Sequence, residues 1–484
     1  MWVRTFAAIL MLVGGGAILL LAAQSNGTPP PSVSGVAAPS ALGLSGCAAR
    51  GCHGGPLTNS DGTRLDPTFR NACSHWLRHD PHSQAYRTLF GTKANAIMRN
   101  LTGPGKAPGE ASTDVRCLAC HVTPSLATAT PTPDVLRLRI EGVSCDACHT
   151  TPGRATSDWL EPHKKGGASG ELARCFAEHG LHWLGTARSR AMTCAGCHVG
   201  APADMEKRLP LREVSHDLVA AGHPRLNFDY PTFLAALPPH WTERRRERDG
   251  STAELSTQFP PRFDVEAWFV GTVESTRAGL LLLADEAERG TTWPELAAFN
   301  CYACHHDLTP GTAVGSDWRQ RRSPPIGALV ANTVPDPLRE LLRDDAEFVT
   351  LDRDLAKRTT RLGGDRLGIA TTARKLAKHL EAVTSPRTGA DLVRGLHLTD
   401  RDLTMLSWDA AAQTYYALVS VNRERDRHIA NRERDAADES LAHLADRLRL
   451  PRTANSPIGY DPRRIASEFR TTAEELTKWF QERK

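Results

Sequence analysis

The sequence has no strong excess of charge of either sign. Its 59 lysine and arginine residues face 55 aspartate and glutamate residues, which leaves a formal net charge of +4 over 484 residues. The basic residues form no stripe along the chain, whereas a nucleic-acid-binding surface requires one. The composition therefore excludes nucleic acid as a partner.

Aromatic residues, methionine and C-terminal cysteine are also scarce. Aromatic residues make up only 6% of the chain, although its length is sufficient for two or three domains and a large core. Outside the N-terminal segment the only methionines are Met98, Met192, Met205 and Met405, and no cysteine follows position 304. The few aromatic residues fit a core that is filled in part by something other than side chains.

Twelve cysteines are present, and eight of them form four C-x-x-C-H strings. Repeated C-x-x-C-H is the attachment signature of c-type haem. Two thiols bond to one porphyrin edge and the next residue's imidazole binds the iron, so one helical turn supplies all three groups. We predict haem attachment at Cys117 and Cys120, Cys145 and Cys148, Cys194 and Cys197, and Cys301 and Cys304, with proximal ligands His121, His149, His198 and His305.

Other uses of paired cysteines explain this pattern less well. A zinc site with four cysteine ligands needs no histidine after every second cysteine. A thioredoxin-like motif occurs singly and beside a βαβ pattern, and disulfide frameworks hold together much smaller domains. None of the three accounts for four repeated histidines.

The string GCAARGCHG at residues 46–54 carries a wider pair, with four residues between Cys47 and Cys52. Among four regular motifs it is interpreted as a fifth attachment site, with His53 as proximal ligand. The small residues between the cysteines make the wider loop sterically easy. A small disulfide ring is the remaining alternative. Cys73 and Cys175 lie outside all motifs and form either a disulfide or two separate thiols.

Histidine is in surplus where the cysteines are. Ten histidines before residue 307 are not proximal ligands, and only four follow, as ligation of each iron by two histidines would require. Since methionine is scarce, we expect low reduction potentials. The candidates for second ligands are His82, His163, His216, His223 and His306, each of which could instead be an ordinary surface histidine; His240 is undecided, and His75, His79, His179 and His182 are interpreted as structural.

In their order along the chain, these strings resemble the multihaem cytochromes of the cytochrome c-554 family, and especially longer exported relatives with an added C-terminal region. The matching strings include DPHSQAY, EGVSCDACH, WLEPH, CAGCHVG, SHDLVAAGHPRLNF and CYACHHDL, over about residues 46–308. The resemblance implies a mainly α-helical fold with stacked haems, an electron carrier that serves a hydroxylamine-oxidising enzyme, and distal ligands at His82, His163, His216 and His223. This chain has five motifs instead of four, and its segment after residue 310 has no counterpart in a simple tetrahaem carrier. The resemblance therefore does not identify the specific redox partner of this chain.

The N-terminus and the C-terminal part predict the organisation of the chain. In residues 1–24, Arg4 precedes an apolar run from Phe6 to Ala23, which predicts an export signal, either cleaved or retained as a membrane anchor. A linker (25–45), a multihaem domain of short helices and loops (46–310) and a helical region (311–484) follow. The segment 407–450 alternates charge densely and predicts a long helix with a solvated face.

Two functions fit these features. Irons bound by two histidines have no place for a substrate, so the leading hypothesis is a periplasmic electron carrier for redox partner proteins, which could be membrane-bound. The alternative is a multihaem oxidoreductase in which one open iron acts on a small nitrogen or sulfur compound.

Overall fold

The computed structural model confirms the predicted mainly α-helical fold. One short antiparallel hairpin accompanies the helices, in which β1 (Arg244–Arg246) pairs with β2 (Thr252–Glu254) so that Arg245 faces Ala253. The structure describes residues 41–65, 70–165, 175–176, 178–225, 227–238, 244–246, 252–254, 263–289, 293–298, 334–359, 364–383, 388–396, 403, 406–428, 433–449 and 460–482. Within these residues no helix is long and apolar enough to cross a membrane.

The cysteine-rich part consists of short helices and turns. The elements are α1 (Leu44–Cys47), α2 (Ala72–His79), η1 (Pro81–Gln84), η2 (Tyr86–Phe90), α3 (Thr92–Thr102), α4 (Val115–His121), η3 (Pro124–Leu126), α5 (Pro133–Ile140), α6 (Cys145–His149), α7 (Thr156–Lys165), α9 (Ala187–His198), α10 (His216–Ala220) and α11 (Tyr230–Ala236). Side-chain caps fix several starts. Asp114 accepts from the Arg116 N–H at α4, and Thr186 and Ser189 form a capping box at α9.

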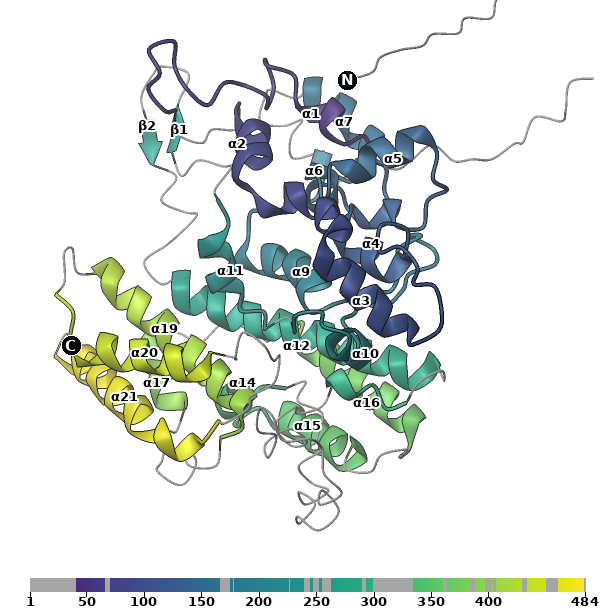
Figure 1. Cartoon of the computed structure of the whole chain (residues 1–484). Helices are drawn as coiled ribbons and strands as arrows, with labels where there is room; N and C mark the ends of the chain where they lie inside the picture. The colour runs from purple at the N-terminus through teal and green to yellow at the C-terminus, as the bar shows by residue number, and fades with distance from the viewer. Residues whose placement is uncertain are drawn as a thin grey trace, which may run out of the picture. The chain divides into compact units, whose positions relative to one another are not determined.

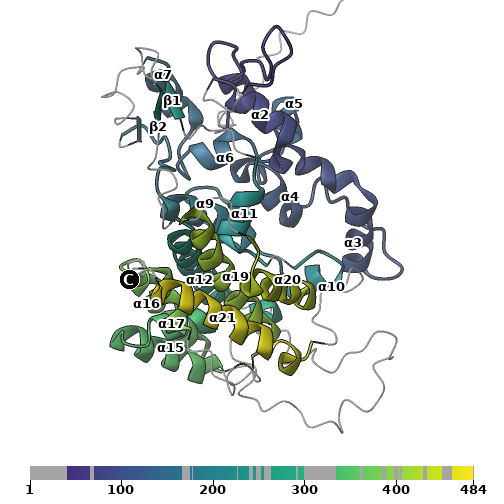
Figure 2. The ribbon, with the colours of Figure 1, turned by 90° about the vertical axis from the view of Figure 1, so that its left-hand side faces the viewer.

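The C-terminal half contains most of the longer helices and several short elements. They are α12 (Phe263–Arg289), α14 (Asp336–Leu341), α15 (Ala346–Thr359), α16 (Arg366–His379), α17 (Gly389–Gly395), α19 (Trp408–His428), α20 (Ala436–Leu448) and α21 (Ala466–Gln481), with single turns η4 (Leu296–Ala298) and η7 (Pro462–Arg464). Figure 2 shows α17, α19, α20 and α21 gathered together, and these helices contact one another.

Helix α12 connects the two halves. It packs against α9, which carries a cysteine motif, and against α16 and α19 of the C-terminal half (Figure 1). Its Trp268 is fully buried in a core that extends from Ala191 of α9 to Phe469 of α21. The largest apolar core is therefore shared by one cysteine-bearing helix and the C-terminal helices.

The charge-rich segment 407–450 differs from the single solvated helix that its sequence predicts. It forms two helices, α19 and α20, and Asp435 caps the second by accepting from the backbone N–H groups of Ala437 and Asp438. Arg425 is almost fully buried and donates to both oxygens of Asp435, at 2.8 and 3.1 Å. Because Asp435 both caps α20 and pairs with the buried guanidinium of Arg425, part of this charged face lies in the protein interior.

Candidate haem sites

Three of the regular motifs end a helix at their histidine. Helices α4, α6 and α9 finish at His121, His149 and His198. Each pair of cysteines therefore lies on the helical turn that precedes its histidine. The cysteines in these three helices are half-buried, so both thiols and the imidazole come from one rigid element, as haem attachment requires.

The wider first motif folds into a compact turn. Helix α1 ends at Cys47, the Cys52 N–H donates to the Ala49 carbonyl at 2.8 Å, and the His53 N–H donates to the Cys47 carbonyl at 3.3 Å. A Cβ at Gly54 would collide with the Ala48 carbonyl, so the glycine after the histidine allows this turn to close. The four intervening residues thus return Cys52 and His53 to Cys47.

The ring of His53 faces the ring of His163 from α7. Their ring centres are 6.2 Å apart and their planes differ by 10°. Burial first, and then the nearby His53, lower the pKa of His163, which favours the neutral imidazole that binds metal. This pair joins residues more than a hundred positions apart.

A second pair of neighbouring rings consists of His198 of α9 and His82 of η1. Their ring centres are 6.0 Å apart and their planes are nearly perpendicular, at 78°. Burial lowers the pKa of His198 to about 4. Burial is also the largest single influence on His82 and opposes its charged form, but the hydrogen bond to Asp80 and the negative charges of Asp80 and Cys197 together outweigh it and raise the His82 pKa. Asp80 Oδ1 lies 2.8 Å from His82 Nδ1, which leaves Nε2 of His82 available for a metal.

His121 and His223 form a third combination. His121 Nδ1 lies 2.9 Å from the Ala85 carbonyl, and His223 Nδ1 lies 2.9 Å from the Pro224 carbonyl. Both contacts hold the proton on Nδ1 and leave Nε2 for a metal. Burial lowers the pKa of His223, and the proximity of His121 adds to this effect. The two rings therefore lie within electrostatic range of one another.

These observations test whether the residues fit haem. With a metal–nitrogen bond of about 2 Å and an imidazole nitrogen about 1.1 Å from its ring centre, two imidazoles on opposite sides of one iron place their centres about 6.2 Å apart. The separations of 6.2 and 6.0 Å in the first two pairs agree with this value. These two pairs are therefore spaced as two histidines on one iron would be.

Thiols of different motifs lie beside one another. Cys145 donates a hydrogen bond to Cys47, which lowers the pKa of Cys47. Cys120 donates to Cys197 and lowers its pKa to about 6, helped by Arg212. Burial, and to a smaller extent Cys194 and Cys197, raise the pKa of Cys148, the other thiol of α6, to about 12. The four motifs in the described residues thus form one continuous series.

Other predicted residues are placed differently. Cys301, Cys304, His305, His306 and His240 lie outside the described residues. His216 begins α10, where its N–H donates to Glu295 Oε1 at 2.7 Å. Within the described part of the chain, no histidine ring faces His216 as His163 faces His53. Cys73 is buried and its N–H donates to the His53 carbonyl at 3.0 Å, and Cys175 is buried with Trp159 and Leu160.

Some site residues were not found from the sequence. Asp80 orients His82, and the string DPH, in which an aspartate begins a turn two residues earlier, is the signal that could have shown it. Phe228 stacks on His198 at 5.3 Å and 15°, and Phe233 meets the same ring edge-on at 4.9 Å. Nothing in the spacing of these phenylalanines identifies that contact.

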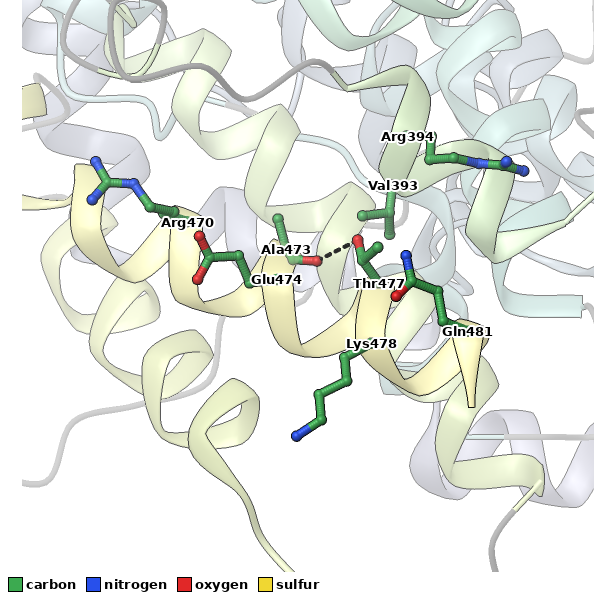
Figure 3. A pocket seen from close by; sticks show the side chains of 8 residues that line it. All are labelled: Val393, Arg394, Arg470, Ala473, Glu474, Thr477, Lys478 and Gln481. Carbon is green, nitrogen blue, oxygen red and sulfur yellow. Dashed lines mark hydrogen bonds between the residues drawn. The ribbon is translucent and has the colours of Figure 1, made fainter. Parts of the chain in front are cut away.

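A surface groove between α17 and α21 is lined by none of the motif cysteines or paired histidines (Figure 3). It has a volume of about 340 Å³ and is lined by Val393, Arg394, Arg470, Ala473, Glu474, Thr477, Lys478 and Gln481. Thr477 Oγ1 donates to the Ala473 carbonyl at 2.7 Å, and Arg394 pairs with Asp391. No cysteine or histidine is among the lining residues, so this groove is no haem site.

One segment of the chain matches the model of a known protein family. Residues 68–150 match the family model of cytochrome c554 and c-prime, which confirms the predicted resemblance over that segment. The matched segment includes the motifs of α4 and α6 together with His82. Neither the curated proteins nor the solved structures include a significant match. The match covers less than a fifth of the 484 residues, so the chain is similar to this family over that segment.

Proposed function

We propose that this protein is an exported, periplasmic multihaem cytochrome that carries electrons between redox partner proteins through five covalently bound haems. The facing of His53 and His163 is the observation that carries the proposal. These two residues come from the wider motif and from a distant helix, and their ring separation of 6.2 Å fits one iron between them. When bound, haem c supplies one-electron redox chemistry at its iron.

The protein's own residues support ligation by two histidines. Asp80, the Ala85 carbonyl and the Pro224 carbonyl each hold the Nδ1 side of one histidine ring. An imidazole held in this way presents Nε2 in a fixed direction. Burial lowers the pKa of His163, His198 and His223, which favours their neutral form. Because histidine replaces the methionine of ordinary cytochromes c, we expect low potentials.

The series of adjacent thiols supports a relay. Cys47 contacts Cys145 of α6, α6 also approaches the thiols of α9, and Cys197 of α9 contacts Cys120 of α4. Groups attached at neighbouring thiols lie close together, so an electron that enters at one end of this series has a continuous path to the other. A carrier needs such a path, whereas a single catalytic iron does not.

The proposal is tested by counting haems and examining their iron. Mass spectrometry of the mature protein gives the haem number and the cleavage of the export segment together, and a pyridine haemochrome assay checks the number. Electron paramagnetic resonance and cyanide binding then report any open iron. Five low-spin haems that bind no cyanide support the carrier. A high-spin iron that binds cyanide favours the oxidoreductase, and a protein without haem contradicts the proposal.

A further inference from the structure

We propose that Asp146 is a positioning residue for the haem site formed by Cys47, Cys52, His53 and His163, although it belongs to a different motif. It is the second residue of CDACH in α6, and its side chain is buried. The inference rests on the proposed function, because it takes that site to hold a haem. In this role, Asp146 fixes the position of the segment that leads to Cys47 relative to the helix that carries His163.

On one side, Asp146 holds the segment that leads to Cys47. The Gly43 N–H donates to Asp146 Oδ2 at 2.7 Å, and the Leu42 N–H approaches Oδ1 at 3.5 Å. Gly43 has a φ of 64°, in the left-handed region that favours glycine. A Cβ at this position would lie 2.6 Å from a methyl carbon of Leu138. Helix α1 begins at the next residue and ends at Cys47, so this anchor fixes where the first thiol lies.

On the other side, a chain of hydrogen bonds joins Asp146 to the helix of His163. Trp159 Nε1 donates to Thr150 Oγ1 at 3.1 Å, the Thr150 and Thr156 hydroxyls lie 3.2 Å apart, and the Thr156 hydroxyl donates to Asp146 Oδ1. Since each hydroxyl donates to the next acceptor, the bonds run in one direction and reinforce one another. The Trp159 ring in turn packs edge-on against His163, with ring centres 5.7 Å apart.

The carboxylate is suited to this role because it only accepts hydrogen bonds. Ser144 Oγ also donates to Oδ2, at 3.1 Å, so each oxygen binds donors from different segments. An ionised carboxylate accepts at about four positions, and bonds to it are stronger than bonds between neutral groups. An asparagine at position 146 would lose acceptors on one side, and so either the α1 side or the α7 side would be released.

Thr156 provides the cleanest test, because it lies outside every cysteine motif. Thr156→Val preserves the shape of the side chain and removes only the hydroxyl, and Thr156→Ser restores it. The low-spin paramagnetic resonance signal of this haem is identified as the one that disappears in His163→Ala. We expect Thr156→Val to shift this signal and leave the others unchanged, and Thr156→Ser to return it to the wild-type position.

A matched control separates positioning from general loss of stability. Thr414 in α19 is also buried and donates a hydroxyl hydrogen bond, to the Ala410 carbonyl at 2.9 Å. Thr414→Val removes a buried hydroxyl far from the cysteine motifs in sequence and should shift no haem signal. If Thr156→Val fails to mature, Trp159→Phe removes the first donor while keeping a ring against His163, and a smaller shift of the same signal is expected.

The outcomes distinguish this inference from the proposed function. If the mass of the wild type shows no haem at Cys47 and Cys52, the predicted haem number is wrong, and the inference is overturned with it. If that haem is present but its signal is the same in Thr156→Val as in wild type, or changes in a way that Thr156→Ser does not reverse, only the role of Asp146 is overturned.

Discussion

The joint between the cysteine-bearing helix α9 and the C-terminal half depends on one buried carboxylate, Glu274 of α12. Arg188 of α9 donates to its Oε1 at 2.7 Å, and Arg277 donates to its Oε2 at 2.6 Å. The same two arginines reach α16 and the residues after it, since Arg188 donates to the Leu380 and Glu381 carbonyls and Arg277 pairs with Glu381. Three helices therefore meet at Glu274.

Replacing Glu274 by alanine should destabilise the fold substantially. The variant loses two charge-assisted hydrogen bonds and leaves two arginines without their buried partner, which costs about 3 kcal/mol. With a urea m value of roughly 3 kcal/mol/M, the unfolding midpoint should fall by roughly 1 M. The assay is urea unfolding of the purified haem protein at pH 7, followed by the helical circular dichroism signal.

Helix α12 also contains a matched control. Glu288 of α12 pairs with Arg374 of α16, but both side chains are more than 40% exposed. Exposed pairs contribute about 0–1 kcal/mol, so Glu288→Ala should lower the midpoint by no more than roughly 0.3 M. Equal midpoint shifts in the two variants would show that burial does not set the strength of this joint, and the reasoning would be refuted.

Three further predictions concern the haem sites and pH. Cys52→Ala should reduce the mass of the mature protein by one haem, and an unchanged mass would leave the count at four. Asp80→Asn removes the charge beside His82, so a redox titration should show a higher potential for the haem ligated by His198; an unchanged titration would contradict this role. Burial raises the pKa of Asp229 to about 6 from its usual 3.8. The folded state therefore binds more protons than the unfolded state between pH 4 and 6, and stability falls as pH rises through this window. Asp229→Asn should gain stability relative to wild type over the same window, as measured by urea unfolding at each pH, and a constant difference would count against the shift.

The C-x-x-C-H motifs could be recognised in the sequence because they are local. One helical turn of α4, α6 or α9 supplies two thiols and a histidine, so their spacing carries the information. The candidate second ligands are different, since the rings of His163 and His53, and of His82 and His198, come together from positions more than a hundred residues apart. A surplus of histidine predicts that such partners exist, but only the fold decides which rings meet.

The prediction of one solvated helix from the charge pattern of residues 407–450 was wrong for a related reason. Alternating charges at helical spacing are typical of a solvated face, yet Arg425 is buried and pairs with Asp435 after a break between α19 and α20. The sequence shows two residues of opposite charge ten positions apart, which one continuous helix could not bring together. The interruption allows the pair to form, and no local pattern of residues marks it.

The position of α12 explains why a cysteine-free region accompanies the haem sites. Short helices that end at their ligands, such as α4 and α6, bury few apolar side chains of their own. Helix α9 instead contributes Ala187, Ala191 and Ala195 to the large core beneath it, only a few residues from Cys194 and His198. These small side chains allow α12 to approach closely, and α12 is held in turn by α16 and α19. The C-terminal helices therefore stabilise the position of one thiol–imidazole site through a continuous apolar core. A substitution at Glu274 that loosens this core should disturb the position of His198 more than the position of His163.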